Sequence, residues 1–200
     1  MKLGIFGGSF DPVHFGHLIL AEQCREQAQL DRVLFIPSAR PPHKADHGLT
    51  PFHQRVEMLT LAISGNPAFQ IDELENARPG PSYTALTLEE LKARDPQADL
   101  WLILGGDSIV DLPLWHQPRR ILELAGLLVV PRPGWRMPDN LHETLGLAPD
   151  FPLRLATIQC PLISIASRDL RQKLSHKMSI RYQTPPAIEA YIADKNLYAG

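Results

Sequence analysis

Residues 7–18 read Gly7-Gly8-Ser9-Phe10-Asp11-Pro12-Val13-His14-Phe15-Gly16-His17-Leu18. They follow a short apolar run, residues 3–6, and they precede apolar residues at helical spacing. We therefore expect a strand, a glycine turn and the start of a helix. Glycines let a backbone approach a ligand closely, and the free amides of a helix start favour an anion. Because His14 and His17 stand where this helix begins, they can hydrogen-bond to phosphate oxygens.

Each of these features also has a structural explanation. A glycine turn after a strand is common, and isolated histidines are usually solvated or satisfied within a core. Metal binding by His14 and His17 is a further alternative, but no nearby set of cysteines or carboxylates completes a tetrahedral site. The glycine spacing fits neither a Walker loop nor the dinucleotide fingerprint. The combination of Gly-Gly, Asp-Pro and His-x-Gly-His directly after the first strand resembles the loop that holds a nucleoside triphosphate in the nucleotidyltransferase superfamily.

Length and composition indicate one soluble globular unit. Two hundred residues allow one domain with a sizeable core, and the hydrophobic share of 44% is ordinary. A net charge of −2 argues against a broad nucleic-acid-binding surface. Cys24 and Cys160 form no paired framework and fit a reducing cytosol. We expect neither a signal peptide nor a membrane partner, because no apolar run reaches the roughly 20 residues that span a bilayer.

The rest of the chain alternates apolar runs with helical patterns. Strands are expected at residues 33–36, 69–71, 100–104, 127–130 and 153–158, with helical segments between them and after them. This pattern predicts an α/β fold, a doubly wound Rossmann-like parallel sheet of about five to six strands with a small C-terminal helical cap. We expect a single domain over residues 1–200, with a core over about 1–165 and a helical part over about 166–200. Residues 135–152 are expected to form a surface excursion.

Further candidate binding residues follow the second and third expected strands. Lys44 comes after Pro41-Pro42-His43, a stiff loop that can present the lysine to a triphosphate; a solvated surface charge is the alternative. The amides of Tyr83 and Thr84 open a helix and offer a second anion site, although simple capping by Ser82 also explains this segment.

Other candidates lie in the second half of the chain. Asp107 follows Gly105 at the end of the fourth strand and can accept a hydrogen bond from a ligand; a helix N-cap is the alternative. Trp115 can stack on a cationic ring, although covering the core is commoner. Ser167 is expected to cap a helix on which Arg168 and Arg171 lie one turn apart and share a face.

Together these segments are similar to the bacterial nicotinate-nucleotide adenylyltransferases, in the family's order and over nearly the whole chain. The opening loop specifies only the superfamily, and the later motifs select this family. The matching segments are Gly7 to His17, Pro41-Pro42-His43-Lys44, Ser82-Tyr83-Thr84, Gly106-Asp107, Trp115, Arg132 with its flanking prolines, Leu170-Arg171 and Asn196-Leu197-Tyr198.

The resemblance implies a cytoplasmic enzyme of NAD biosynthesis that transfers the adenylyl group of ATP to nicotinate mononucleotide, with Mg²⁺ accompanying ATP and no metal-ligating protein residues. The amides of Tyr83 and Thr84 are then expected to meet the nicotinate carboxylate, and Trp115 to stack on the pyridine ring. The implied site residues are catalytic His14, His17, Lys44 and Arg171; ATP-binding Gly7, Gly8, Ser9, Phe10, Gly105, Asp107 and Arg168; and substrate-binding Tyr83, Thr84, Trp115 and Arg132.

The chain departs from the family pattern near its C-terminal helices. Ala166 and Arg168 stand where the family has a hydroxyl residue, so hydroxyl contacts are not carried over there. Two alternatives to the assigned function stay open. A phosphopantetheine adenylyltransferase or a cytidylyltransferase shares the opening loop, and a nucleotide-sensing module would bind ATP without reacting. The sequence also leaves open whether the chain forms a homo-oligomer and how strictly it prefers the acid over the amide substrate.

Overall fold

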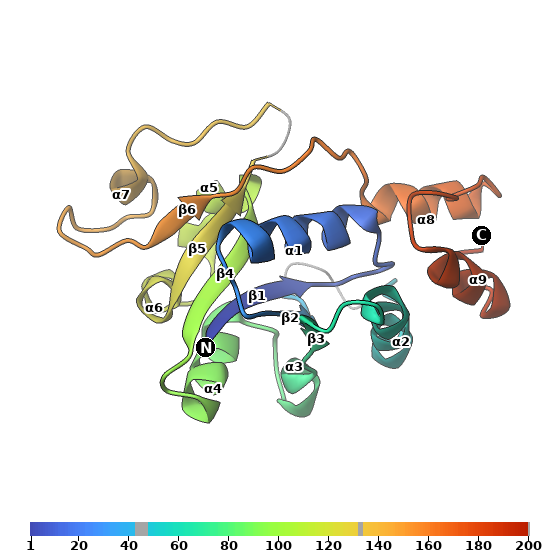
Figure 1. The fold of residues 1–200 in the computed structure, drawn as a ribbon, viewed down its shortest axis with the longest axis horizontal. Coiled ribbons are helices and arrows are strands. Elements are labelled where there is room, and N and C mark those ends of the chain that lie inside the picture. The colour runs from blue at the N-terminus through green and yellow to red at the C-terminus, as the bar shows by residue number, and fades with distance from the viewer. Residues whose placement is uncertain (43–47, 132–133, 200) are drawn as a thin grey trace.

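The computed structural model describes residues 1–42, 48–131 and 134–199. Its centre is a twisted sheet with helices on both faces (Figure 1). Within the described residues the sheet has six parallel strands in the order β3-β2-β1-β4-β5-β6. The strands are Lys2–Gly8 (β1), Arg32–Pro37 (β2), Phe69–Ile71 (β3), Asp99–Gly105 (β4), Ala125–Val130 (β5) and Leu155–Thr157 (β6). The prediction of a doubly wound Rossmann-like parallel sheet is confirmed.

Helices connect the strands and close the chain. Those after the first two strands and at the C-terminus lie in the helical segments expected between and after the strands, whereas α3 and α7 span one turn each and were not predicted. The described helices are Phe15–Gln27 (α1), Phe52–Ile63 (α2), Leu74–Ala77 (α3), Thr84–Arg94 (α4), Asp107–Asp111 (α5), Leu112–Leu114 (η1, a 3₁₀ turn), Pro118–Leu124 (α6), Leu141–Thr144 (α7), Ser167–Ser175 (α8) and Pro186–Asp194 (α9). No helix among the described residues is long and apolar enough to cross a membrane.

The central strands are apolar on both faces because helices cover both faces. Successive side chains of a strand point to opposite sides of the sheet. Accordingly, Val33 and Phe35 of β2 join one hydrophobic cluster, and Leu34 and Ile36 join the other. Such two-sided burial gives a parallel strand a continuous apolar sequence. It explains why the short apolar runs predicted these strands.

The two clusters divide the helices into two layers. One cluster receives side chains from α1, α2, α8 and α9, and the other receives side chains from α3, α4, α5 and α6. The C-terminal helices are therefore packed into the first layer, where Leu170, Ile188 and Ile192 share a cluster with Phe6 and Phe35. Figure 1 shows α8 and α9 at one end of the sheet, and α9 packs against α2.

Two predicted helix caps are wrong, because both hydroxyls bond to distant backbone instead. Tyr83 and not Ser82 is the N-cap of α4, and Ala166 precedes α8 in place of Ser167. The Ser82 hydroxyl accepts hydrogen bonds from the amides of Ala39 and Arg40, at 3.1 and 3.0 Å. The Ser167 hydroxyl donates to the carbonyl of Pro12 at 2.9 Å. These serines tie loops together around the carboxyl ends of the strands.

Candidate active site

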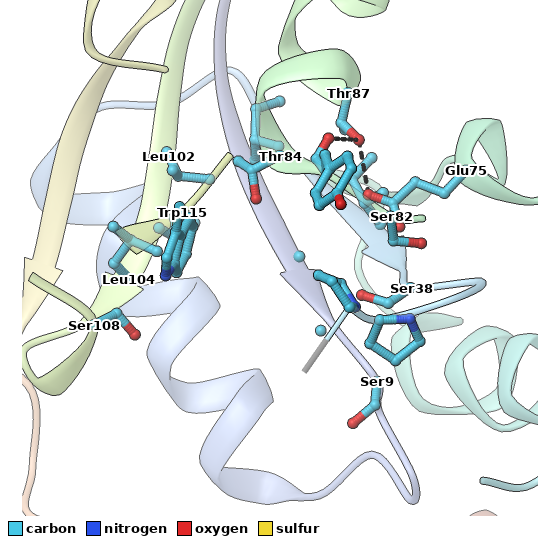
Figure 2. Close-up of a pocket in the computed structure, with 18 residues that line it drawn as sticks. Ser9, Ser38, Glu75, Ser82, Thr84, Thr87, Leu102, Leu104, Ser108 and Trp115 are labelled. Carbon is cyan, nitrogen blue, oxygen red and sulfur yellow. Dashed lines mark hydrogen bonds between the residues drawn. The ribbon is translucent and has the colours of Figure 1, made fainter. Parts of the chain in front are cut away.

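A pocket of about 400 Å³ lies at the carboxyl ends of β1, β2 and β4 (Figure 2). In open α/β sheets, ligands bind in the crevice at the point where the strand order reverses, which here falls between β1 and β4. The start of α4 and the residues after η1 complete its walls. Its lining residues are Ile5, Gly7, Gly8, Ser9, Ile36, Ser38, Pro41, Pro42, Glu75, Ser82, Tyr83, Thr84, Thr87, Leu102, Ile103, Leu104, Ser108 and Trp115.

Six of the predicted site residues meet in this pocket. They come from three separate segments, the end of β1 with its turn, the start of α4 and the residue after η1. They are Gly7, Gly8, Ser9, Tyr83, Thr84 and Trp115. Lys44 and Arg132 lie outside the described residues. The other predicted residues are described below, and none of them lines the pocket wall.

The turn after β1 is held in place by an aromatic core. Phe10 has a left-handed φ of 48° and is 1% exposed. Its ring packs edge-on against Phe6, with centroids 5.4 Å apart, and against Phe35. The Phe10 side chain is therefore part of the core, so any contact of this residue with ATP falls to its backbone. This anchoring fixes the turn that presents Gly8 and Ser9 to the pocket.

His14 and His17 form a stacked pair at the start of α1. Their ring centroids lie 3.7 Å apart at an interplanar angle of 25°, and the His14 amide donates to Nδ1 of His17 at 3.3 Å. His14 is the N-cap of α1 and is 5% exposed, while His17 is half-buried against Phe10. A Cβ on Gly16 would lie 3.0 Å from the His14 ring. The glycine between the histidines thus leaves room for the stacked arrangement.

Asp11 links the opening turn to the C-terminal segment. Its side chain is fully buried, and Oδ1 accepts a hydrogen bond from the Tyr198 hydroxyl at 2.6 Å. Burial and the neighbouring Asp11 carboxylate raise the pKa of the Tyr198 hydroxyl. Nη1 of Arg171 donates to the Asp11 carbonyl at 2.6 Å and lies 3.9 Å from Oδ2. Arg171 is thereby fixed beside the turn that the sequence analysis assigned to phosphate binding.

The two arginines of α8, which are one turn apart as predicted, have different environments. The Arg168 side chain is 84% exposed and lies 3.3 Å from the Asp169 carboxylate, an ion pair between neighbours on the surface. The Arg171 side chain is 31% exposed and reaches back to Asp11. Only Arg171 is placed by contacts with the site.

Arg55 of α2 is a structural residue of the site that the sequence analysis missed. It is 2% exposed, and its guanidinium donates to the carbonyls of Ser9, Ser38 and Thr50, at 2.8, 2.9 and 2.9 Å. Burial lowers its pKa, and the Asp11 carboxylate opposes this shift. One side chain therefore joins the turn after β1 to the loop after β2. Its spacing from Met58, Leu59 and the other buried residues of α2 is the signal that places it on the inner face.

The start of α4 forms the opposite wall. Tyr83 stacks on His116, with ring centroids 4.2 Å apart and an interplanar angle of 21°. This contact joins α4 to the loop that carries Trp115, so the predicted anion site and the predicted stacking residue belong to one wall. Helix starts favour anions because their first amides have no intrahelical partner.

The Gly105-Gly106-Asp107 turn joins β4 to α5 and directly precedes Ser108, which lines the pocket. Gly105 ends β4, and Asp107 is an exposed residue in the first turn of α5, so the predicted N-cap alternative is wrong. A Cβ on Gly106 would overlap the ring of Trp135. The expected surface excursion, residues 135–152, therefore packs inward at Trp135 and also at buried Leu145.

Comparisons with known proteins identify relatives over nearly the whole chain. A model of the cytidylyltransferase-like family matches residues 5–178. Over 197 residues the chain is 46% identical to a protein of Thermomicrobium roseum named probable nicotinate-nucleotide adenylyltransferase, covering 98% of this chain and 91% of that one. The chain belongs to the nicotinate-nucleotide adenylyltransferase family. A family member of the same name from Thermus thermophilus is 41% identical over 99% of this chain and all of its own length.

Solved structures with low sequence identity to this chain confirm the fold. Plasmodium falciparum nicotinic acid mononucleotide adenylyltransferase complexed with NaAD superimposes with a TM-score of 0.83 at 22% identity, over 98% of this chain and 97% of that chain. A second structure of that enzyme, complexed with APC, gives a TM-score of 0.79 at 21% identity, over 98% and 96% of the chains. The resemblance seen in the sequence is thus confirmed at the level of the family and of the fold.

Proposed function

We propose that this protein transfers the adenylyl group of ATP to nicotinate mononucleotide. A phosphate oxygen of the mononucleotide attacks the α-phosphorus of ATP in line with the bond to the β-phosphate. The new P–O bond gives nicotinate adenine dinucleotide, and the broken P–O bond releases pyrophosphate. The attacking oxygen is already anionic at neutral pH, so the protein's contribution is to position the reactants and neutralise charge rather than to remove a proton.

The observation that carries this proposal is the pocket itself. It joins the glycine turn after β1, which suits close approach of phosphates, to a wall made by Tyr83, Thr84 and Trp115. The first amides of α4 suit the carboxylate of nicotinate, and the indole of Trp115 suits the cationic pyridine ring. The names of the relatives at 46% and 41% identity support the same substrate.

The triphosphate is assigned to the turn beside this pocket. His14 and His17 at the start of α1 are proposed to bind the α- and β-phosphates, and Arg171 is proposed to bind the triphosphate from α8. Lys44, outside the described residues, is proposed to supply a further cation. The remaining proposed ATP contacts are the backbone of Gly7 to Phe10 together with Gly105, Asp107 and Arg168. The remaining proposed contact with nicotinate mononucleotide is Arg132.

Mg²⁺ is proposed to enter with ATP. The described residues include no group of three or more His, Cys, Asp or Glu side chains placed to hold a metal ion. Mg²⁺ commonly binds nucleotide phosphates with few protein ligands, so this site fits an ion carried by the substrate. Free thiols at Cys24 and Cys160 support a reducing, cytoplasmic location.

Product analysis with ATP labelled at its α-phosphate tests this proposal. With Mg²⁺ and nicotinate mononucleotide, we expect the label in a dinucleotide and equimolar unlabelled pyrophosphate. Label transferred only to phosphopantetheine would assign the chain to another branch of the superfamily. ATP binding without transfer to either acceptor would indicate a sensing module.

A further inference from the structure

Glu75 of α3 is a buried carboxylate in the wall of the pocket (Figure 2). It is 6% exposed, and Oε1 accepts a hydrogen bond from the Thr87 hydroxyl at 2.7 Å. Its other oxygen, Oε2, is buried and has no hydrogen-bond partner among the described residues. Among the described residues that line the pocket, Glu75 is the only one with a charged side chain.

Among the described residues, Arg78 belongs to the same hydrogen-bond network but makes no ion pair with Glu75. Nη2 of Arg78 donates to the Thr87 hydroxyl at 3.4 Å. Nη1 lies 3.7 Å from the Glu90 carboxylate and is itself buried without a hydrogen-bond partner among the described residues. Arg78 therefore reaches Glu75 only through Thr87, on the side of Oε1. A buried acceptor that lacks a partner destabilises the protein until a ligand or water supplies one. Oε2 thus lacks a donor among the described residues, and the residue that carries it lines the pocket.

The chemistry of the substrate narrows the choice of donor. A carboxylate only accepts hydrogen bonds, and its charge repels the carboxylate and the phosphate of nicotinate mononucleotide. Apart from these anionic groups, the hydrogen-bond donors of that molecule at neutral pH are its two ribose hydroxyls. We propose that Oε2 of Glu75 accepts a hydrogen bond from a ribose hydroxyl of the mononucleotide. This inference rests on the proposed function and adds a positioning contact between the pyridine ring and the reacting phosphate.

Binding measurements on the unaltered protein test the contact first. Isothermal titration with nicotinate mononucleotide and its 2′-deoxy and 3′-deoxy analogues is carried out in the presence of a non-hydrolysable ATP analogue. The Kd of at least one deoxy compound is expected to exceed that of the parent by about 10- to 100-fold, because hydrogen bonds to charged groups have this strength. Equal affinity for all three compounds would overturn the proposal.

The Glu75→Gln variant shows whether Glu75 causes this discrimination. The amide keeps the size of the side chain. We expect the variant to bind nicotinate mononucleotide more weakly than the unaltered protein does. Removing the ribose hydroxyl should then raise the Kd of the variant little further. Equal weakening of parent and deoxy compounds would mean that Glu75 only braces α3 against α4, and would overturn the proposal. If the variant instead loses its discrimination between ATP and 2′-deoxy-ATP, the hydroxyl belongs to ATP and the proposal is also wrong.

Two controls make the result specific. Glu73→Gln removes an exposed carboxylate two residues away and is expected to leave every Kd unchanged. Thr87→Val removes the hydrogen bond to Oε1, and discrimination between the parent and the deoxy analogue is expected to survive it. The product assay tests the proposed function separately. If the protein binds these ligands but forms no dinucleotide, the proposed function is wrong, while the binding measurements still show whether Glu75 contacts the ribose.

Discussion

Arg55 stabilises the site at the scale of a single residue. Its guanidinium binds three carbonyls from segments far apart in the sequence, and it is almost fully buried. The planar fork of arginine suits several acceptors at once, whereas a lysine ammonium is a compact point charge on a flexible stem. The charge of Arg55 and its geometry therefore both contribute to holding the two loops of the pocket.

Arg55→Lys is expected to lower the free energy of unfolding by about 3 kcal/mol, because buried carbonyls lose charge-assisted hydrogen bonds. Urea denaturation measures this change. Arg119→Lys is the matched control, since the Arg119 side chain is 77% exposed and its replacement should change stability by less than about 0.5 kcal/mol. Similar small losses in both variants would show that the three-carbonyl contact contributes little.

His17→Ala tests the proposed phosphate contact. The side chain lies at the start of α1, half-buried beside the turn after β1. Removing one preorganised donor to a developing charge lowers turnover by about 10²- to 10³-fold, and we expect that loss in kcat with an unchanged circular dichroism spectrum. His53→Ala replaces an exposed histidine of α2 and should retain full turnover. Near-normal turnover of His17→Ala, or its unfolding, would remove the basis for this assignment.

At the scale of elements, the segments on both sides of α9 are joined to the opening turn and the start of α1. Tyr198 donates to buried Asp11, Thr184 donates to the carbonyl of Val13 at 2.8 Å, and the Phe15 amide donates to the carbonyl of Gln183. The C-terminal helices therefore support the turn and the start of α1 directly. Changes in the last residues of the chain should affect the stability of this part of the site.

The Tyr198 pKa gives this contact a pH dependence. Because burial and Asp11 raise the pKa in the folded state, the folded protein keeps the phenolic proton after the unfolded chain has lost it. The stabilisation is complete below about pH 10, the ordinary value for tyrosine, and is lost as pH rises above it. Tyr191, whose pKa burial and Glu57 raise to about 12, contributes with the same sign.

Tyr198→Phe is therefore expected to lower stability at pH 8 by about 1–2 kcal/mol, since Asp11 loses a hydrogen bond. The difference in the free energy of unfolding between the variant and the unaltered protein should be smaller at pH 11, because the unaltered protein has by then lost part of the stabilisation from Tyr198. Urea denaturation at both pH values measures the two gaps. Tyr182→Phe, at a side chain that is 86% exposed, is the control and should show no gap at either pH. A Tyr198 gap that stays constant would contradict the raised pKa.

At the scale of the whole molecule, the parts of the fold that could be predicted are the strands that are buried on both faces. Strands such as β2 and β4 are covered on both faces, so they appear in the sequence as uninterrupted apolar runs. The one-turn helices α3 and α7 are too short for a helical period to be recognised. The sequence indicated the turn after β1 and the start of α4 as parts of the pocket because glycines and helix-start residues reveal local backbone structure.

The missed parts of the site depend on contacts between distant segments. Ser82 and Ser167 look like helix caps locally, but their hydroxyls bond to loops elsewhere in the chain. Nothing local distinguishes Glu75 from any other acidic residue, because its burial arises where α3 packs on β2 and where Glu75 hydrogen-bonds to Thr87 of α4. Arg55 could have been found by its position on the buried face of α2. Long-range hydrogen bonding is what the sequence pattern does not display.

The proposed function requires that one pocket at the carboxyl end of the sheet selects nicotinate mononucleotide through the start of α4 and Trp115. The most direct test is kcat/KM for pyrophosphate release with ATP and Mg²⁺, compared between nicotinate mononucleotide and its nicotinamide counterpart. An anion site made of backbone amides predicts a preference of at least about 10-fold for the acid, since hydrogen bonds to a charged group are stronger. Equal use of both compounds, or a preference for the amide, would contradict the account.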